Sequence, residues 1–258
     1  MSQYPIYEGT IARQQQPLAI ITGATRGLGR ALARCLLDQG WAVAFCGRTV
    51  PQIVQNVSEW SPLGPVLGIA GDLSDEKFVD VLIPMVVNHW GRLDAVVNNA
   101  STLGNLPLPS IRQMDGNNFR EVLKMNVVVP LQLVSAALPH LDRTGGMSLA
   151  ISSDAAVGGY SGWAAYGGAK AALDLAYLTL ANEEPHLKFY TVDPGDMDTT
   201  MHHEAIPDDP GPLRNPGDVA KALSMLFLHP QVEPAAFPSG TRLKVVKSER
   251  ELRLEAEI

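Results

Sequence analysis

Tyr166 and Lys170 are the two residues whose types and spacing could do chemistry together. They lie in a helical stretch, WAAYGGAKAALDLAYLTLA, where a spacing of four places both side chains on one face, one turn apart. An ammonium group beside a tyrosine hydroxyl favours the phenolate and lowers the tyrosine pKa from about 10 by roughly 1–3 units. Tyrosine then becomes a usable general acid/base near neutral pH. Ser153 precedes Tyr166 at the end of an expected strand, where its hydroxyl could bind a substrate oxygen.

A glycine-rich turn, TGATRGLGR, follows the first expected strand and contains Gly23, Gly27 and Gly29. Between a strand and a helix, glycines permit a tight turn and a close approach of the backbone to a pyrophosphate. The helix N-terminus then offers free N–H groups and its positive dipole end. The turn therefore predicts a dinucleotide site, although an ordinary glycine-rich turn could have the same spacing.

The end of the second expected strand indicates which dinucleotide is bound. An acidic side chain there would accept hydrogen bonds from the ribose of NAD. The residues are instead Gly47, Arg48 and Thr49. Arg48 can pair with a 2′-phosphate through its planar guanidinium, and Arg26 adds a second positive charge nearby. The two arginines favour NADP(H), with solvated surface charges as the alternative.

These residues must be positioned by an alternation of apolar runs and helical patterns. Because several runs are apolar throughout, they are typical of strands covered on both faces. The alternation predicts an α/β fold: a single-domain, doubly wound parallel sheet of the Rossmann type with about seven strands and helices on both faces. The expected strands are 17–22, 41–46, 66–71, 93–99, 147–153, 187–192 and 241–246.

We divide the chain into an N-terminal arm (1–16), the nucleotide-binding and catalytic domain (17–247) and a C-terminal tail (248–258). The tail alternates charged and apolar residues, which favours an extra strand, with a frayed helix as the alternative. The segment 196–215 follows a strand end where α/β folds bind ligands, and its second half is rich in proline. We expect it to be a mobile substrate lid.

Several motifs in order resemble the short, single-domain branch of the short-chain dehydrogenase/reductase family over roughly residues 17–246. They are TGATRGLG (22–29), GDL (71–73), NNA (98–100), Asn126 in KMNVVVP, SS (152–153), YGGAK (166–170) and DPGDMDT (193–199). Two small departures are Ser101, where the family often has glycine, and Ala169, where serine is common. The acids Asp196 and Asp198 are less typical and leave the nature of the pocket mouth open.

The resemblance implies a role for each matching residue. Tyr166 resembles the catalytic acid/base, and Ser153 the residue that holds the substrate carbonyl. Lys170 matches the lysine that holds the nicotinamide ribose and lowers the tyrosine pKa, and Asn126 matches the asparagine that helps to place a water in the proton relay. Asp72 resembles the adenine contact, Thr199 the nicotinamide amide contact, and Asn98 and Ala100 line the cofactor cleft. The expected cofactor-binding residues are Gly23, Thr25, Arg26, Gly27, Leu28, Gly29, Arg48, Asp72, Leu73, Asn99, Ala100, Tyr166, Lys170, Pro194, Gly195, Met197 and Thr199.

The function expected from these residues is that of an NADP(H)-dependent oxidoreductase acting on a carbonyl or secondary alcohol, with NADPH favouring reduction. The alternatives are a non-catalytic NADP(H)-sensing protein on the same fold and a carrier-protein-linked 3-ketoacyl reductase. Enoyl reductases of related fold space tyrosine and lysine by seven, but seven residues after Tyr160 stands Gly167. We expect a small-molecule substrate and, by resemblance, a homo-oligomer (dimer or tetramer).

Composition limits the other classes. The 258 residues carry a net charge of −7 without a Lys/Arg cluster, which argues against nucleic acid. Cys35 and Cys46 form no CxxC pattern, so we expect reduced thiols. His202 and His203 would point about 100° apart on a helix and chelate poorly, so no metal is expected. We find no apolar run of membrane-spanning length and no signal-peptide core, and we expect a cytoplasmic protein without a membrane partner.

Overall fold

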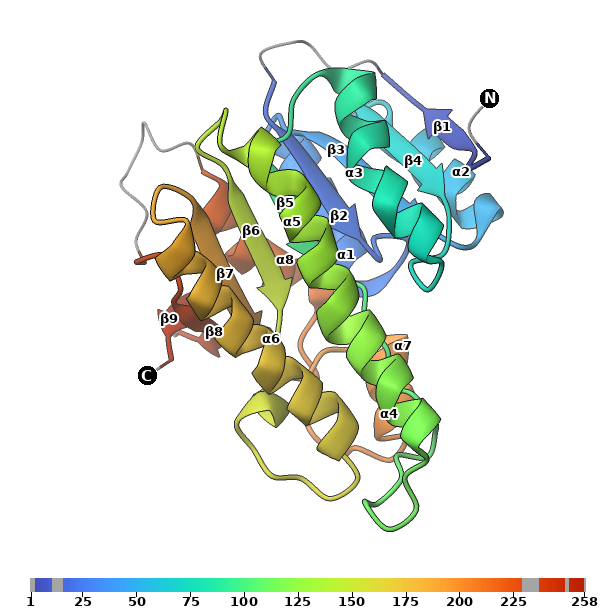
Figure 1. Ribbon diagram of the computed structural model, residues 1–258, viewed down its shortest axis with the longest axis vertical. Coiled ribbons are helices and arrows are strands. Elements are labelled where there is room, and N and C mark those ends of the chain that lie inside the picture. The colour runs from blue at the N-terminus through green and yellow to red at the C-terminus, as the bar shows by residue number, and fades with distance from the viewer. Residues whose placement is uncertain (1–2, 11–15, 229–236, 249–250, 258) are drawn as a thin grey trace.

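The computed structural model describes residues 3–10, 16–228, 237–248 and 251–257 (Figure 1). The strands described there form one sheet of nine, in the order β1-β4-β3-β2-β5-β6-β7-β8-β9. Their bounds are β1 Ile6–Glu8, β2 Leu18–Thr22, β3 Ala42–Gly47, β4 Val66–Ala70, β5 Ala95–Asn98, β6 Met147–Ile151, β7 Lys188–Asp193, β8 Arg242–Lys247 and β9 Leu252–Ala256. The seven inner strands are parallel, which confirms the expected doubly wound sheet.

The two outer strands are antiparallel and raise the strand count above the expected seven. β1 pairs with β4 (Ile6 opposite Ile69), so part of the expected N-terminal arm belongs to the sheet. β9 pairs with β8 (Val245 opposite Leu254), so the tail forms the extra strand and not the alternative helix. Both ends of the described chain therefore close the edges of the sheet.

Helices cover both faces of the sheet. In Figure 1, α3 (Glu76–Trp90), α5 (Val129–Leu141) and α6 (Ala164–Glu183) cross the near face. The far face carries α1 (Gly27–Asp38), α2 (Val50–Trp60) and α8 (Pro216–Ser224). Successive strand residues serve opposite cores: Ile20 packs with the first set of helices and Ile21 with the second. Because both faces are covered, every residue of β2, β4 and β6 is buried, as their continuous apolar runs require.

The order of the strands reverses between β2 and β5. The chain runs outward from β2 to β3 and β4, then returns to place β5 on the other side of β2. The connections therefore diverge at this point, and a crevice opens beyond the carboxyl ends of the strands.

One long helical stretch runs from α4 (Gly116–Leu123) through a π-helix (Lys124–Val128) into α5. Its length and a mean hydropathy of 1.5 also suit a membrane span, which our sequence reading had not recognised. Here α5 packs against α3, and α4 packs against α6. The stretch is thus a core helix of the α/β fold in this structure.

Candidate active site

A cavity of about 1040 Å³ opens at the carboxyl ends of the inner strands, around the point where their order reverses. It brings together most of the predicted site. Of the catalytic residues it is lined by Ser153, Tyr166 and Lys170. The expected cofactor residues that also line it are Gly23, Thr25, Arg26, Gly27, Leu28, Arg48, Asp72, Leu73, Asn99, Ala100, Pro194, Gly195, Met197 and Thr199.

The glycine-rich turn joins β2 to α1 at one end of the cavity. Gly23 and Gly27 have φ values of 66° and 58°, a left-handed conformation that side chains rarely adopt. Gly29 does not line the cavity; a Cβ there would lie 2.4 Å from Nδ2 of Asn99, so this glycine is required for packing. The same Nδ2 donates to the carbonyls of Thr22 and Gly23 and fixes the turn. No side chain caps the start of α1, so its first N–H groups are left for a ligand.

Arg26 and Arg48 lie exposed along the same end of the cavity. A close-fitting glycine cradle, an uncapped helix start and two cationic side chains are what a phosphorylated dinucleotide requires. The residues present therefore fit a nicotinamide dinucleotide.

Asn98 does not line the cleft, and our prediction for it was wrong. It is the last residue of β5, is 3% exposed, and its Nδ2 donates to the hydroxyl of Tyr177 over 2.8 Å. Successive residues of a strand point to opposite faces, so Asn98 turns into the core below α5 and α6. Only its neighbours Asn99 and Ala100 face the cavity.

Tyr166 and Lys170 project from α6 into the deepest part of the cavity. Tyr166 is 8% exposed and Lys170 2%. The lysine Nζ lies 5.4 Å from the centre of the tyrosine ring and donates to the carbonyl of Ile151 over 2.7 Å. Trp163 packs edge-on against Tyr166, with 5.5 Å between ring centres. The tyrosine ring is thus fixed between the indole and the lysine.

The pKa of Tyr166 is shifted in the direction opposite to our prediction. Burial raises it to about 12, and the negative charges of Asp193 and Asp154 add to this. Burial also lowers the pKa of Lys170 to about 8, while Asp174 opposes that shift. Spacing in the sequence predicts proximity but not desolvation, which favours the neutral form of both groups. The tyrosine therefore holds its proton firmly in the cofactor-free protein.

Ser153 stands at the start of the short 3₁₀ turn Asp154–Ala156. Its Oγ accepts from the N–H of Ala155 at 3.1 Å and donates to Oδ1 of Asp154 at 3.0 Å. The hydroxyl of Tyr160 donates to the other oxygen of Asp154 at 2.9 Å. Sequence reasoning missed Asp154, although its place directly after the SS motif was a signal. To donate to a substrate carbonyl, the Ser153 hydroxyl must turn away from Asp154.

Asn126 lies in the π-helix, is 1% exposed and does not line the cavity. Its Oδ1 accepts from Oγ of Ser101 and N–H of Thr102, both at 3.0 Å, and its Nδ2 donates to the carbonyl of Thr102. Ser101 in turn hydrogen-bonds the Tyr166 hydroxyl and opposes the rise in its pKa. We had expected little from serine at position 101, but it links Asn126 to the tyrosine.

Three carboxylates line the substrate side of the cavity: Asp154, Asp193 and Asp196. Asp193 is 8% exposed, and burial raises its pKa although the N–H of Gly195 donates to its Oδ1. Asp198, which the sequence also marked as unusual, does not line the cavity. The pocket mouth is therefore acidic.

Residues 17–210 match the family described as short chain dehydrogenase. The chain belongs to the short-chain dehydrogenase family. An uncharacterised oxidoreductase of Schizosaccharomyces pombe is 30% identical, over 85% of this chain and 94% of the relative. L-fucose dehydrogenase of Oryctolagus cuniculus is 32% identical, over 87% of this chain and 79% of the relative. An alcohol dehydrogenase from the archaeon Thermococcus sibiricus, solved with 5-hydroxy-NADP, has a TM-score of 0.77 and 26% identity, covering 89% of this chain and 96% of that chain.

In this short-chain dehydrogenase, the expected lid 196–215 forms a loop whose two ends are joined. Met197 and Arg214 form an isolated bridge, and Nη1 of Arg214 donates to the carbonyls of Pro194 and Val245. Between these ends, α7 (Thr200–Ala205) places Met201 against the cavity. We call the bridge and its arginine contacts the neck of the lid.

His202 and His203 on α7 bind different partners. Nε2 of His202 lies 2.7 Å from Asp209, and its Nδ1 lies 3.6 Å from Asp196. Nε2 of His203 lies 2.8 Å from Asp198. The two imidazoles therefore stabilise the lid through separate carboxylates and do not converge on one point.

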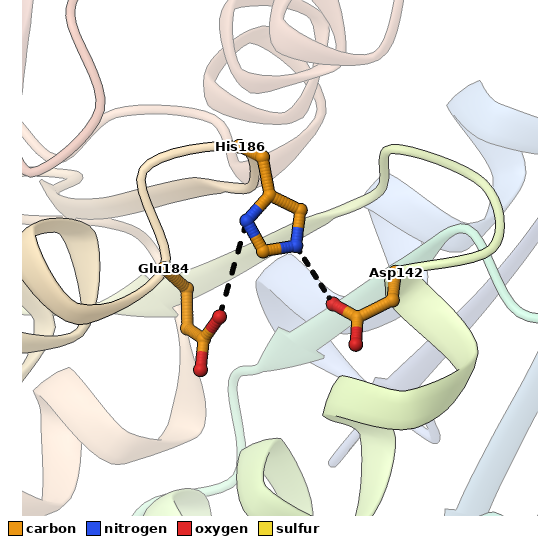
Figure 2. A group of neighbouring side chains, drawn as sticks. All are labelled: Asp142, Glu184 and His186. Carbon is orange, nitrogen blue, oxygen red and sulfur yellow. Dashed lines mark hydrogen bonds and ion pairs between the residues drawn. The ribbon is translucent and has the colours of Figure 1, made fainter.

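One group in the described part of this dehydrogenase has the composition of a metal site: Asp142, Glu184 and His186. Figure 2 shows the imidazole between the two carboxylates, with Nε2 at 3.0 Å from Asp142 and Nδ1 at 3.9 Å from Glu184. The group follows α5 and α6 at the amino-terminal edge of the sheet, opposite the cavity. It consists of surface ion pairs and does not take part in the candidate active site.

Proposed function

We propose that this protein is an NADP(H)-dependent oxidoreductase that interconverts a carbonyl and a secondary alcohol, with Tyr166 as general acid/base. The observation that carries the proposal is the convergence of Tyr166, Lys170 and Ser153 on one cavity that also contains the glycine turn. The bound nicotinamide would supply and accept the hydride. The chain's own residues would bind the cofactor, orient the substrate and move the proton.

The glycine turn and the start of α1 would hold the phosphates, with Arg26 and Arg48 at the adenosine end. Two arginines and no carboxylate at the end of β3 support NADP(H) over NAD(H). The archaeal alcohol dehydrogenase solved with 5-hydroxy-NADP adds to this support. Lys170, held at the end of β6 by the carbonyl of Ile151, would bind the nicotinamide ribose.

In the reductive direction, the Ser153 hydroxyl would orient the carbonyl oxygen and Tyr166 would donate its proton to it. The resulting phenolate would be stabilised by the Lys170 ammonium and by the Ser101 hydroxyl, both already in place. A raised pKa keeps Tyr166 protonated, which suits an acid that waits for substrate. Asp154 would release Ser153 when the substrate oxygen arrives.

The test is NADPH oxidation with a panel of ketones and aldehydes, and NADP⁺ reduction with a panel of alcohols. L-fucose belongs in the second panel because the rabbit relative is named an L-fucose dehydrogenase. Tyr166→Phe should lower kcat by about a hundredfold to ten-thousandfold and leave the Kd for NADPH unchanged, since only proton transfer is lost. The matched control is Tyr190→Phe, because that buried hydroxyl donates to the carbonyl of Phe237. If Tyr166→Phe keeps more than about a tenth of the wild-type kcat, the acid/base role is wrong.

The cofactor preference has its own test. Each charge-assisted hydrogen bond to the 2′-phosphate is worth about 1.5–3 kcal/mol, so Arg26→Ala with Arg48→Ala should reduce the preference for NADPH by on the order of a hundredfold. Arg34→Ala is the control, because Arg34 lies on the exposed face of α1 and pairs with Glu59. Equal kcat/KM for NADH and NADPH in the wild type would overturn the NADP(H) assignment. No turnover on either panel, with NADPH bound tightly, would favour a sensing protein.

A further inference from the structure

Behind the catalytic serine lies a cluster of charges that the proposed reaction does not use directly. We define it as the Arg242 cluster: Arg242 at the start of β8, Asp174 on α6 and Glu257 after β9. Their side chains are 13%, 12% and 24% exposed. Charges this far from water are expensive unless each one is paired, so the pairing has a consequence for folding or for function.

The guanidinium of Arg242 is bound in three directions. Its Nε donates to Oδ2 of Asp174 at 2.8 Å, and its Nη2 donates to the carbonyl oxygen of Ser153 at 2.8 Å. Its Nη1 forms an ion pair with Glu257. Because the guanidinium is planar and rigid, three partners fix its position and its plane.

The first two contacts reach the catalytic groups. The Ser153 carbonyl accepts from Arg242 and, at 3.0 Å, from the N–H of Ala156, so the peptide that carries the serine hydroxyl is held on one side by the cluster. The preceding Ser152 donates through Oγ to the same Asp174 oxygen at 2.8 Å. The two serines of the SS motif are therefore tied to β8 and α6 together.

The cluster also acts on Lys170. Asp174 lies one turn after Lys170 on α6 and opposes the fall of the lysine pKa that burial causes. Its second oxygen, Oδ1, is buried and has no hydrogen bond among the described residues. Two carboxylates and one guanidinium leave the cluster with one net negative charge, which the Lys170 ammonium balances. The ammonium that the proposed mechanism needs is thus supported from behind.

Glu257 brings the end of the chain into this arrangement. β9 pairs with β8 so that Leu243 lies opposite Ala256, and the N–H of Glu257 donates to the carbonyl of Arg242 at 2.8 Å. The backbone pairing therefore delivers the Glu257 carboxylate to the guanidinium.

We propose that Arg242 is a positioning residue for Ser153 and Lys170, and that the C-terminal strand belongs to the catalytic apparatus because Glu257 holds Arg242 in place. The proposal rests on the proposed function for its kinetic consequences. Its geometric part, the fixing of the Ser153 peptide, holds independently of the reaction.

The experiment compares full-length Glu257→Gln and Arg242→Lys with Glu255→Gln. Glu255 lies on the same strand in an exposed pair with Arg253, so it is a matched control outside the cluster. Small misplacements of reacting groups are costly, so Glu257→Gln and Arg242→Lys should each lower kcat at least about tenfold. We expect the substrate KM and the Kd for NADPH to stay close to wild type, and Glu255→Gln to be unchanged. Hydrogen exchange of residues 152–157 should be faster in the two cluster variants only.

Two results would overturn the proposal. One is a lower melting temperature with wild-type kcat per folded molecule, which would make the cluster purely structural. The other is an equal loss of kcat and NADPH affinity, which would place its effect on the cofactor. If Arg242→Lys does not fold, Glu257→Gln decides alone. If the wild type turns over no substrate, the proposed function fails, and hydrogen exchange still decides the positioning: wild-type exchange at 152–157 in Glu257→Gln would refute it.

Discussion

Replacing Lys170 with methionine should stabilise the cofactor-free protein while it abolishes the proposed activity. Lys170 is 2% exposed, and burial lowers its pKa to about 8. The folded state therefore carries a charge that is held more easily in water. Methionine is unbranched and adaptable and can fill the same space without a charge. It loses the hydrogen bond to the buried carbonyl of Ile151, which costs about 1–3 kcal/mol.

The magnitude follows from the pKa of Lys170. The value falls from 10.5 to about 8 on folding. A shift of about 2.5 units corresponds to ~3.4 kcal/mol against the folded state wherever both states are protonated. Less the lost hydrogen bond, the variant should be about 1–2 kcal/mol more stable near neutral pH. As the pH rises above 8, the folded state loses its proton while the unfolded state keeps it up to 10.5, so the wild type gains stability in this window.

The assay is urea unfolding of cofactor-free wild type and Lys170→Met at two pH values. The advantage of the variant should shrink by about 2 kcal/mol between pH 7 and pH 9.5, because only the wild type gains stability there. Lys221→Met is the control, since the Lys221 side chain is 76% exposed and no such change is expected. A difference between wild type and Lys170→Met that does not change with pH, or a variant less stable at pH 7, would refute the reasoning.

Three further predictions concern the core, the pocket and the lid. Tyr177→Phe should lower the free energy of unfolding by about 1–3 kcal/mol, because Nδ2 of Asn98 loses its short buried partner; a change below about 0.5 kcal/mol in urea unfolding would contradict this. A keto acid should have a lower kcat/KM than its methyl ester, because Asp154 and Asp193 line the cavity, and Asp193→Asn should narrow the difference; equal values in the wild type would show that the acidic mouth does not select. NADPH and substrate together should slow hydrogen exchange over 199–212; protection already complete in the cofactor-free protein would exclude a mobile lid.

The inner sheet was predictable from sequence because its strands are defined by their own residues. The apolar runs that predicted strands at 41–46 and 147–153 correspond to β3 and β6, which need cover on both faces wherever they lie. β1 was not predictable, because three residues carry no period and become a strand only by pairing with the open edge of β4. β9 has the right alternation, but only the free edge of β8 decides between strand and helix.

The site was predictable where its residues act through local spacing, as Tyr166 and Lys170 do on one helix. It was not predictable where a role depends on a distant partner. Arg242 acts on Ser153 from another strand, and Ser101 acts on the tyrosine from the loop after β5. The direction of the Tyr166 pKa shift was missed for the same reason, since desolvation depends on everything packed around the ring.

The π-helix Lys124–Val128 makes this part of the chain intolerant of insertions and deletions. A π turn amounts to one extra residue within an α-helix. Deleting any single residue there would restore a continuous helix and turn α4 by about 100° relative to α5. Asn126 would then leave Ser101 and Thr102. The lid beyond its neck has no such register, so length variation among homologues should gather there and avoid 124–128.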